Sequence, residues 1–206
     1  MSYDTLYQAR PDRILWGDRP GRLVARINEF LPPGSLILDA GCGDGKNALY
    51  LEQQGYRVLG FDASSYALEG LRNRFRKAEA RVRGIYDFLD VETYLKTYSG
   101  ERVDGLVSYG LFHCLPPHRR IPLHLQLQDH LKPGGYLFFA TMVDGVPLPA
   151  HHQTEGVTLA SLDEVDRLFK NMDLRHASSN IIEEDHFPAV GKHQHHVMRV
   201  IVRKLY

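Results

Sequence analysis

The chain has 206 residues, and its 25 lysine and arginine residues balance its 25 aspartate and glutamate residues. Because phosphate binding needs concentrated positive charge, this balance disfavours nucleic acid as the main partner. We find neither a signal peptide nor an apolar stretch of membrane-spanning length, which favours a cytoplasmic protein without membrane contact. The length suits one hydrophobic core, so we expect a single domain over residues 1–206.

The most informative segment runs from Leu36 to Ser64. An apolar run ends in Asp39 and is followed by the glycine turn Gly41-Cys42-Gly43-Asp44-Gly45. A helical segment comes next, and a second apolar run, 58–61, ends in Asp62. This order predicts a strand–turn–helix–strand unit that holds a nucleotide-like ligand. Glycines let the backbone approach the ligand closely, and a carboxylate after the second strand can accept hydrogen bonds from a ribose diol.

The spacing of the glycines distinguishes between two classes of cofactor. Dinucleotide-binding proteins use G-x-G-x-x-G to hold a pyrophosphate, whereas the turn here is G-x-G-x-G. Asp39 and Asp44 stand on either side of the turn, where negative charge would repel a pyrophosphate and attract an ammonium or sulfonium group. We therefore expect S-adenosylmethionine rather than NAD.

The rest of the chain continues the alternation of strands and helices. We expect a helix from Ser64 or Ser65, a strand at 81–86 followed by Asp87-Phe88, a helix at 91–98, a strand at 103–108, a helix from Pro116-Pro117, a turn at 132–135, a strand at 136–142, a helix after the capping box 161–164, and strands near 174–183 and 194–204. This pattern predicts a doubly wound α/β fold with a largely parallel sheet and helices on both faces.

The motifs D-A-G-C-G-D-G and G-F-D-A-S resemble motifs I and II of the class I S-adenosylmethionine-dependent methyltransferases. The segment GCGDGKNALYLEQQGYRVLGFDAS is particularly similar to the small bacterial tellurite-resistance and thiopurine-type methyltransferases. Weaker similarity at Tyr7, Pro11, Trp16-Gly17 and LKPGGYLFFATM extends the resemblance over most of residues 1–145. The resemblance implies a Rossmann-like seven-stranded sheet whose last strand is antiparallel. It also implies that Asp62 binds the ribose, that the glycine turn passes beneath the methionine moiety, and that Asp87 meets the adenine amino group.

Ligands of open α/β sheets bind beyond the carboxyl ends of the parallel strands, and this rule turns the linear pattern into a site. Trp16 is expected to close the site from an N-terminal cap segment, residues 1–30. For Trp16, Asp62 and Asp87, simple packing or turn roles remain open. The candidate cofactor-binding residues are Trp16, Asp39, Gly41, Cys42, Gly43, Asp62, Ala63, Asp87, Phe88 and Tyr109.

The histidines form a second unusual feature. His151 and His152 lie in a Pro- and Gly-rich loop, 143–160, that is long enough to be a lid. On the last strand, His193 and His195 should point to one face and His196 to the other. We take His193, His195 and His196 as candidate metal ligands, with help from the lid; anchoring of an anionic substrate by imidazolium groups and a solvent-facing loop remain alternatives.

Methyl transfer mainly requires alignment of the acceptor, and a hydroxyl or amine acceptor also benefits from a base. The candidate catalytic residues are His113, His151, His152 and Tyr109. If histidine acts, activity should titrate near pH 6–7. The [DNS]-P-P-[YFW] signature of amino methyltransferases is absent, since S-Y-G-L follows the fourth strand. We therefore expect methyl transfer to a small molecule carrying a thiol, metalloid oxyanion, hydroxyl or amine. A cofactor-binding regulatory or metal-sensing protein without turnover and an NAD(P)-linked oxidoreductase remain alternatives, and the oligomeric state stays open.

Overall fold

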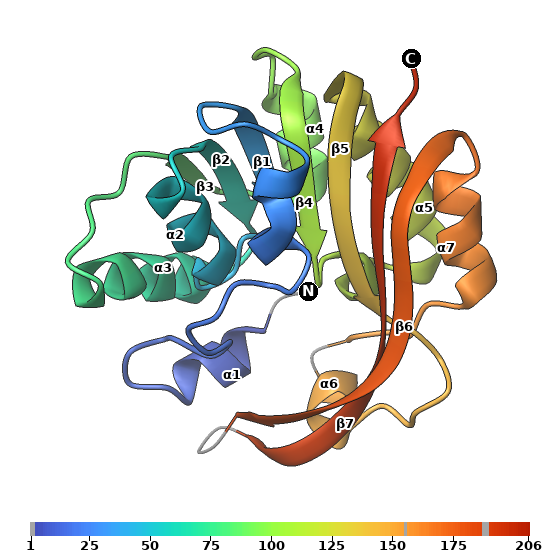
Figure 1. Cartoon of the computed structure of the whole chain (residues 1–206). Helices are drawn as coiled ribbons and strands as arrows, with labels where there is room; N and C mark the ends of the chain where they lie inside the picture. The colour runs from blue at the N-terminus through green and yellow to red at the C-terminus, as the bar shows by residue number, and fades with distance from the viewer. Residues whose placement is uncertain (1–2, 155, 187–189) are drawn as a thin grey trace.

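The computed structural model describes residues 3–154, 156–186 and 190–206, and it contains one seven-stranded sheet in the order β3-β2-β1-β4-β5-β7-β6 (Figure 1). Its strands are β1 (Leu36–Ala40), β2 (Arg57–Asp62), β3 (Ile85–Phe88), β4 (Val103–Tyr109), β5 (Leu131–Met142), β6 (Met172–His186) and β7 (Val190–Lys204). Its helices are α1 (Asp4–Gln8), η1 (Val24–Glu29), α2 (Lys46–Gln53), α3 (Ser65–Lys77), α4 (Val91–Thr97), η2 (Phe112–Cys114), α5 (Pro117–Asp129), α6 (Ala150–Thr154) and α7 (Leu162–Phe169).

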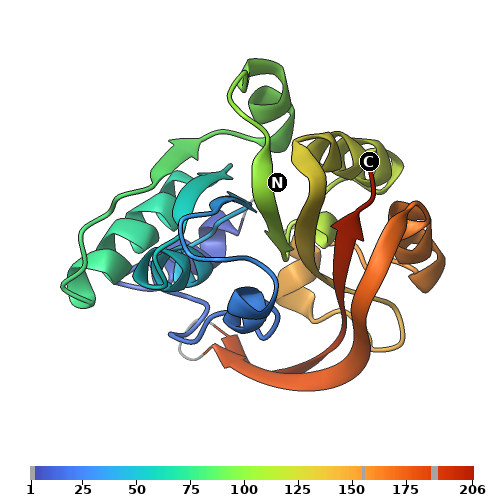
Figure 2. The same cartoon turned by 45° about the horizontal axis from the view of Figure 1, so that its top comes forward.

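The strands β1 to β5 pair in parallel, and β7 runs antiparallel to both β5 and β6. The predicted doubly wound Rossmann-like sheet with an antiparallel last strand is therefore confirmed. Helices lie on both sides of the twisted sheet, as the tilted view of Figure 2 also shows. Among the described residues, no helix is long and apolar enough to cross a membrane.

Two buried layers hold the sheet between its helices, because alternate side chains of a strand point to opposite faces. Leu106 and Phe139 pack with side chains of α4, α5 and α7, whereas Val107 and Phe138 pack with η1 and α2. All four side chains are fully buried. The central strands β4 and β5 are thus packed with apolar side chains on both faces. This packing holds in place the carboxyl ends of the two strands, where the candidate site begins.

Three strand boundaries differ from the sequence-based expectation. β3 contains only Ile85–Phe88, and the residues at 81–84 form no strand. β5 already starts at Leu131, which pairs with Val103 across a register shift, so the expected turn at 132–135 is an irregular part of the strand. β6 and β7 each have 15 residues and are longer than expected.

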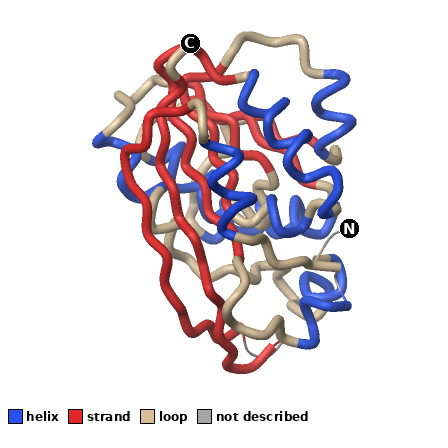
Figure 3. Tube along the Cα trace, turned by 90° about the vertical axis from the view of Figure 1, so that its right-hand side faces the viewer, coloured by secondary structure: helices blue, strands red, loops and turns tan. Residues whose placement is uncertain are grey.

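The additional length of β6 and β7 forms a hairpin that extends past the rest of the sheet (Figure 3). Strand pairing of β5 with β7 stops at Val197, although the carbonyl of His196 still accepts the backbone N–H of Val143 at 2.9 Å. Within the described chain, residues 182–186 and 190–195 pair only with each other, and we call them the hairpin extension. Figure 1 shows this extension at the same end of the molecule as α1 and α6, beyond the carboxyl ends of the parallel strands.

A buried carboxylate ties the cap segment to the glycine turn. Asp44 is fully buried, and one of its oxygens accepts hydrogen bonds from the backbone N–H groups of Leu15 (2.6 Å) and Trp16 (2.9 Å). Its other oxygen accepts a hydrogen bond from Nη2 of Arg74 on α3 at 2.9 Å, and Nε of Arg74 donates to the Asp44 carbonyl at 2.9 Å. The carboxylate of Asp44 therefore holds the glycine turn, the cap segment and α3 together.

We predict that Asp44→Ala lowers the free energy of unfolding by about 3–5 kcal/mol, because it leaves the guanidinium of Arg74 buried without its carboxylate and removes the acceptor of two backbone N–H groups. Asp18→Ala is the matched control, since Asp18 also contacts Arg74 but its side chain is 96% exposed. Urea denaturation should show a far smaller loss for this control. Equal losses in the two variants would contradict the structural role of Asp44.

Candidate functional site

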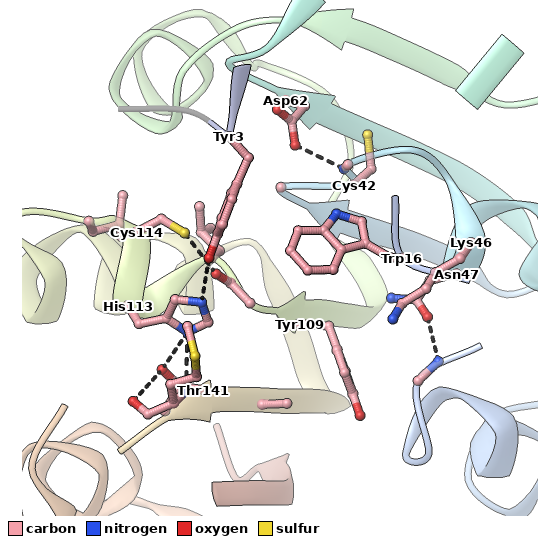
Figure 4. A pocket seen from close by; sticks show the side chains of 18 of the residues that line it. Tyr3, Trp16, Cys42, Lys46, Asn47, Asp62, Tyr109, His113, Cys114 and Thr141 are labelled. Atoms are coloured by element: carbon pink, nitrogen blue, oxygen red, sulfur yellow. Dashed lines mark hydrogen bonds between the residues drawn. The ribbon is translucent and has the colours of Figure 1, made fainter. Parts of the chain in front are cut away.

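A cavity of about 660 Å³ lies beyond the carboxyl ends of the parallel strands. This volume is within the range of about 300–1,000 Å³ that is typical of small-molecule sites. Figure 4 shows Tyr3 and Trp16 projecting into the cavity from the cap segment, with Tyr3 reaching toward His113. The glycine turn, the ends of β2, β4 and β5, the start of α4, α6 and the hairpin extension supply the other walls.

One half of the cavity is built around the glycine turn and Asp62. Gly41 and Gly43 have φ angles of +70° and +55°, in the left-handed region that favours glycine. The carboxylate of Asp62 accepts hydrogen bonds from the backbone N–H groups of Gly43 and Ser64, both at 2.9 Å. Burial raises the pKa of Asp62 to about 6. Asp62 lines the cavity. Because a carboxylate has more lone pairs than these two N–H groups use, it can accept further hydrogen bonds from a ligand.

The other predicted residues of this half have different surroundings. Cys42 and Ala63 both line the cavity, and burial raises the pKa of the Cys42 thiol well above its usual value. Both cysteines are free thiols, and Cys114 is only partly buried. Trp16 donates its indole N–H to the hydroxyl of Tyr7 at 2.7 Å and stands edge-on to Tyr3. Tyr3 was not among the predicted site residues.

The two acids that flank the turn play different parts. Asp39, on β1 just before the turn, is fully buried and is not among the residues that line the cavity. Within the described chain its Oδ2 atom has no hydrogen-bond partner. Burial, with a contribution from Asp62, raises the pKa of Asp39 to about 7. Asp44 lines the cavity, but its carboxylate pairs with Arg74, which reduces the negative charge that it offers to a cationic ligand.

The predicted roles of Asp87 and Phe88 do not fit the structure. Both side chains are exposed, and neither lines the cavity. Phe88 is the last residue of β3, in register with Asp62, and the chain then turns so that Asp90 reaches the cavity. Asp90 also caps α4 by accepting the Thr93 N–H at 2.8 Å. The Asp-x-x-Thr pattern at the start of the predicted helix was the sequence signal for this residue.

Tyr109 closes the cavity near the cap segment. Its hydroxyl oxygen accepts hydrogen bonds from the backbone N–H of Arg22 at 3.2 Å and from Nε of Arg199 at 3.4 Å. These donors favour a role as a wall over the predicted catalytic role. Arg199 on β7 also lines the cavity and is only 5% exposed, and its Nη1 atom has no hydrogen-bond partner in the part of the chain that the structure describes.

His113 is buried in the cavity wall after the end of β4. Its Nδ1 atom accepts the backbone N–H of Met142 at 3.1 Å, so the ring proton is on Nε2, which lies 3.5 Å from the hydroxyl of Tyr3. Burial, followed by the neighbouring His195 and Arg120, lowers the pKa of His113 to about 3. The prediction of His113 as a base titrating near pH 6–7 is therefore wrong: it presents a neutral N–H donor to the cavity.

The remaining histidines separate into two groups. His152 on α6 and His195 on the hairpin extension are both buried and line the cavity, and His193 lies on the same face of β7 as His195. This arrangement confirms the predicted alternation. His196 points to the other face, where its ring contacts Ser179 Oγ at 2.6 Å and the carbonyl of Asp144 at 2.5 Å, so its grouping with the other two was wrong. The side chain of His151 lies outside the described residues.

The comparisons with known proteins agree with this geometry. Residues 37–135 match the family model described as "Methyltransferase domain". The chain is 32% identical over 116 residues to the probable S-adenosyl-L-methionine-dependent methyltransferase TehB of Haemophilus influenzae, covering 55% of this chain and 38% of that protein. It therefore spans well under two thirds of that relative's length.

Two solved structures share the fold. TehB from Haemophilus influenzae superposes with a TM-score of 0.70 at 22% identity, over 88% of this chain and 61% of that chain. A 1,6-didemethyltoxoflavin-N1-methyltransferase from Burkholderia thailandensis superposes with a TM-score of 0.64 at 21% identity, over 89% of this chain and 77% of that chain. Residues 37–135 thus match a methyltransferase domain, and the chain is similar to TehB in sequence and in fold.

Proposed function

We propose that this protein binds S-adenosylmethionine in the cavity and transfers its methyl group to a small-molecule acceptor. The observation that carries the proposal is the pairing of the glycine turn with Asp62 at the carboxyl ends of β1 and β2, inside a cavity of suitable size. The named relative TehB is described as S-adenosylmethionine-dependent, and the Burkholderia structure contains S-adenosylhomocysteine with its acceptor. We take residues 1–206 as one domain that acts on small molecules rather than nucleic acid.

The charges around the turn fit a cationic cofactor. Asp62 would hold the ribose hydroxyls, and the backbone at Gly41–Gly43 would pass below the methionine moiety. Asp39, on β1 just before this turn, has an oxygen that lacks a hydrogen-bond partner among the described residues. Burial and Asp62 raise its pKa, although Lys46 lowers it. A cationic ligand would favour the ionised form of Asp39. Asp90, at the start of α4, is the acid best placed for the adenine amino group.

The transfer itself is an in-line displacement in which the acceptor's lone pair forms a bond to the methyl carbon while the carbon–sulfur electron pair remains on sulfur. Catalysis depends on alignment of the acceptor and exclusion of water. Tyr3 and Trp16 from the cap segment and His152 from the loop 143–160 meet over the cavity, where Tyr3 packs edge-on against both rings. We propose that these two segments together close the site.

The acceptor half of the cavity supplies donors and positive charge. His113 presents its Nε2–H, and Arg199 presents a buried guanidinium without an ion pair among the described residues. Because a buried cation without an anion is costly, Arg199 favours an acceptor with a negatively charged group. Thiols, metalloid oxyanions, phenols and amines that carry such a group are the first candidates.

The activity can be tested by measuring S-adenosylhomocysteine formation with a panel of thiols, phenols, amines and metalloid oxyanions. We expect turnover with at least one anionic acceptor, and a reaction without acceptor is the control. Tight binding of S-adenosylmethionine without turnover by any acceptor would favour a regulatory protein instead. Binding of NADH in preference to S-adenosylmethionine would contradict the cofactor assignment.

We predict that Asp62→Ala weakens S-adenosylmethionine binding by about 1.5–3 kcal/mol in a folded protein, because it removes hydrogen bonds to a charged group. Asp87→Ala is the matched control, since Asp87 is an exposed acid of the neighbouring strand outside the cavity. Isothermal titration should show an unchanged affinity for this control. A loss in Asp87→Ala as large as that in Asp62→Ala would restore the role of Asp87 that the sequence suggested.

The cofactor affinity should also depend on pH. The pKa values of Asp39 and Asp62 are raised to about 7 and about 6, so both carboxyls are ionised above pH 7 and become neutral as the pH falls through these values. A cationic ligand favours the ionised forms, and we expect binding about tenfold or more weaker at about pH 5.5 than at about pH 8. His113→Gln should keep the same profile, because the pKa of His113 is about 3. A profile that disappears in His113→Gln would assign the dependence to histidine.

A further inference from the structure

Three histidines from two separate segments meet at the acceptor end of the cavity. His152 comes from α6, and His193 and His195 come from the hairpin extension. One ring nitrogen of each lies within 4.8 Å of the others, and Nε2 of His152 is 3.2 Å from Nε2 of His195. His152 is 2% exposed and His195 is 4% exposed, so the pair is withdrawn from solvent yet lines the cavity.

These positions fit a tetrahedral metal site. Zinc–nitrogen bonds of about 2.0–2.1 Å at tetrahedral angles put two ligand nitrogens roughly 3.3 Å apart. The separation of 3.2 Å between the nitrogens of His152 and His195 is close to this value. The third histidine needs only a side-chain adjustment, since its ligand atom is already within 4.8 Å.

The surroundings of the cluster also favour a cation. Nδ1 of His193 lies 2.6 Å from the carbonyl of Gly191, which fixes the proton on Nδ1 and leaves the lone pair on Nε2. Such a hydrogen bond from the second ring nitrogen is typical of metal-binding histidines. A carboxylate oxygen of Glu184, which also lines the cavity, is 3.8 Å from Nε2 of His195 and adds negative charge.

The same geometry argues against anion binding by imidazolium groups. Two positive rings with nitrogens 3.2 Å apart would repel strongly in a buried setting, whereas one ion between them could accept a lone pair from each ring. Neutral imidazoles are the form that binds transition metals.

We propose that His152, His193 and His195 bind one divalent transition metal ion, with Zn²⁺ as the best match, and that its remaining coordination position faces the cavity. Imidazole ligands suit zinc, and three protein ligands with an open fourth position are the arrangement of catalytic zinc sites. The metal site can exist whether or not the protein transfers methyl groups. A catalytic role of the metal, however, rests on the proposed methyl transfer.

The ion would promote deprotonation of the acceptor, which His113 cannot do. Since His113 presents an N–H donor, it does not accept a proton from the acceptor. A divalent ion at the acceptor end would lower the pKa of a hydroxyl or thiol group beside it, so that the proton leaves to solvent and the anion attacks the methyl carbon. The carbon–sulfur bond breaks in the same step, and its electron pair stays on sulfur. The acceptor class is therefore a hydroxyl or thiol compound able to approach a metal ion.

The test is titration of the chelator-treated protein with Zn²⁺, and with Co²⁺ as a spectroscopic probe. We expect one equivalent to bind and Co²⁺ to give the visible absorption of a tetrahedral site. His195→Ala and His193→Ala should each weaken binding by about two orders of magnitude or more. Because His193 is only partly buried, its variant serves if His195→Ala fails to fold. His196→Ala is the matched control on the same strand and should bind the ion like the wild type.

Absence of stoichiometric binding, or an equal loss in His196→Ala, would overturn the metal site. Titration with S-adenosylmethionine on the same samples separates the two proposals. A protein that binds the cofactor and transfers methyl groups but takes up no ion retains the proposed function without the metal. A protein that binds the ion at these histidines but not the cofactor retains the metal site without the proposed function.

Discussion

The buried contact between Asp44 and Arg74 is the constraint on which the site depends. It joins the glycine turn to α3, and the remaining oxygen of Asp44 holds the cap segment through two backbone N–H groups. An ion pair that is withdrawn from water tolerates little displacement, because separating it would leave a buried charge uncompensated. The positions of Tyr3, Tyr7 and Trp16 over the cavity follow from this attachment, since all three belong to the attached segment.

The cavity is polarised along its length. Asp39 and Asp62 stand at the half around the glycine turn, where burial raises the pKa of both carboxyls and each carries negative charge once it is ionised. Arg199 and the N–H of His113 give the opposite half hydrogen-bond donors. A cationic cofactor and an anionic acceptor would each be drawn to a different end, and their reacting atoms would meet between the two. Such separation of charge orients both ligands before any reaction begins.

The sequence predicted the parts of the fold that follow from local patterns. The strand–turn–helix–strand unit and the capping box at Ser161 are found, because glycine spacing, apolar runs and caps act over a few residues. The antiparallel last strand is also found, but it was expected only from the family resemblance. The exposed position of Asp87 was missed, since the place where a strand ends depends on its pairing with a neighbour. The role of Asp44 depends on a partner 30 residues away, Arg74, which no local pattern indicates.

The histidines show the same division. Alternation along β7 correctly separated His196 from His193 and His195, because that rule needs only the strand. The protonation of His113 was missed, because it is set by a backbone N–H at Met142 on another strand and by complete burial. A histidine's position in the sequence says where it can lie, whereas its neighbours in space decide which nitrogen carries the proton.

The hairpin extension has a consequence for how such a protein can diversify. Residues 182–186 and 190–195 pair only with each other within the described chain and lie beyond the matched segment 37–135. The face that carries Glu184, His193 and His195 can therefore change without loss of pairing in the other strands. Under the proposed function, exchanging this two-stranded ribbon between relatives would alter one wall of the acceptor site while Arg199 and His113 stay in place.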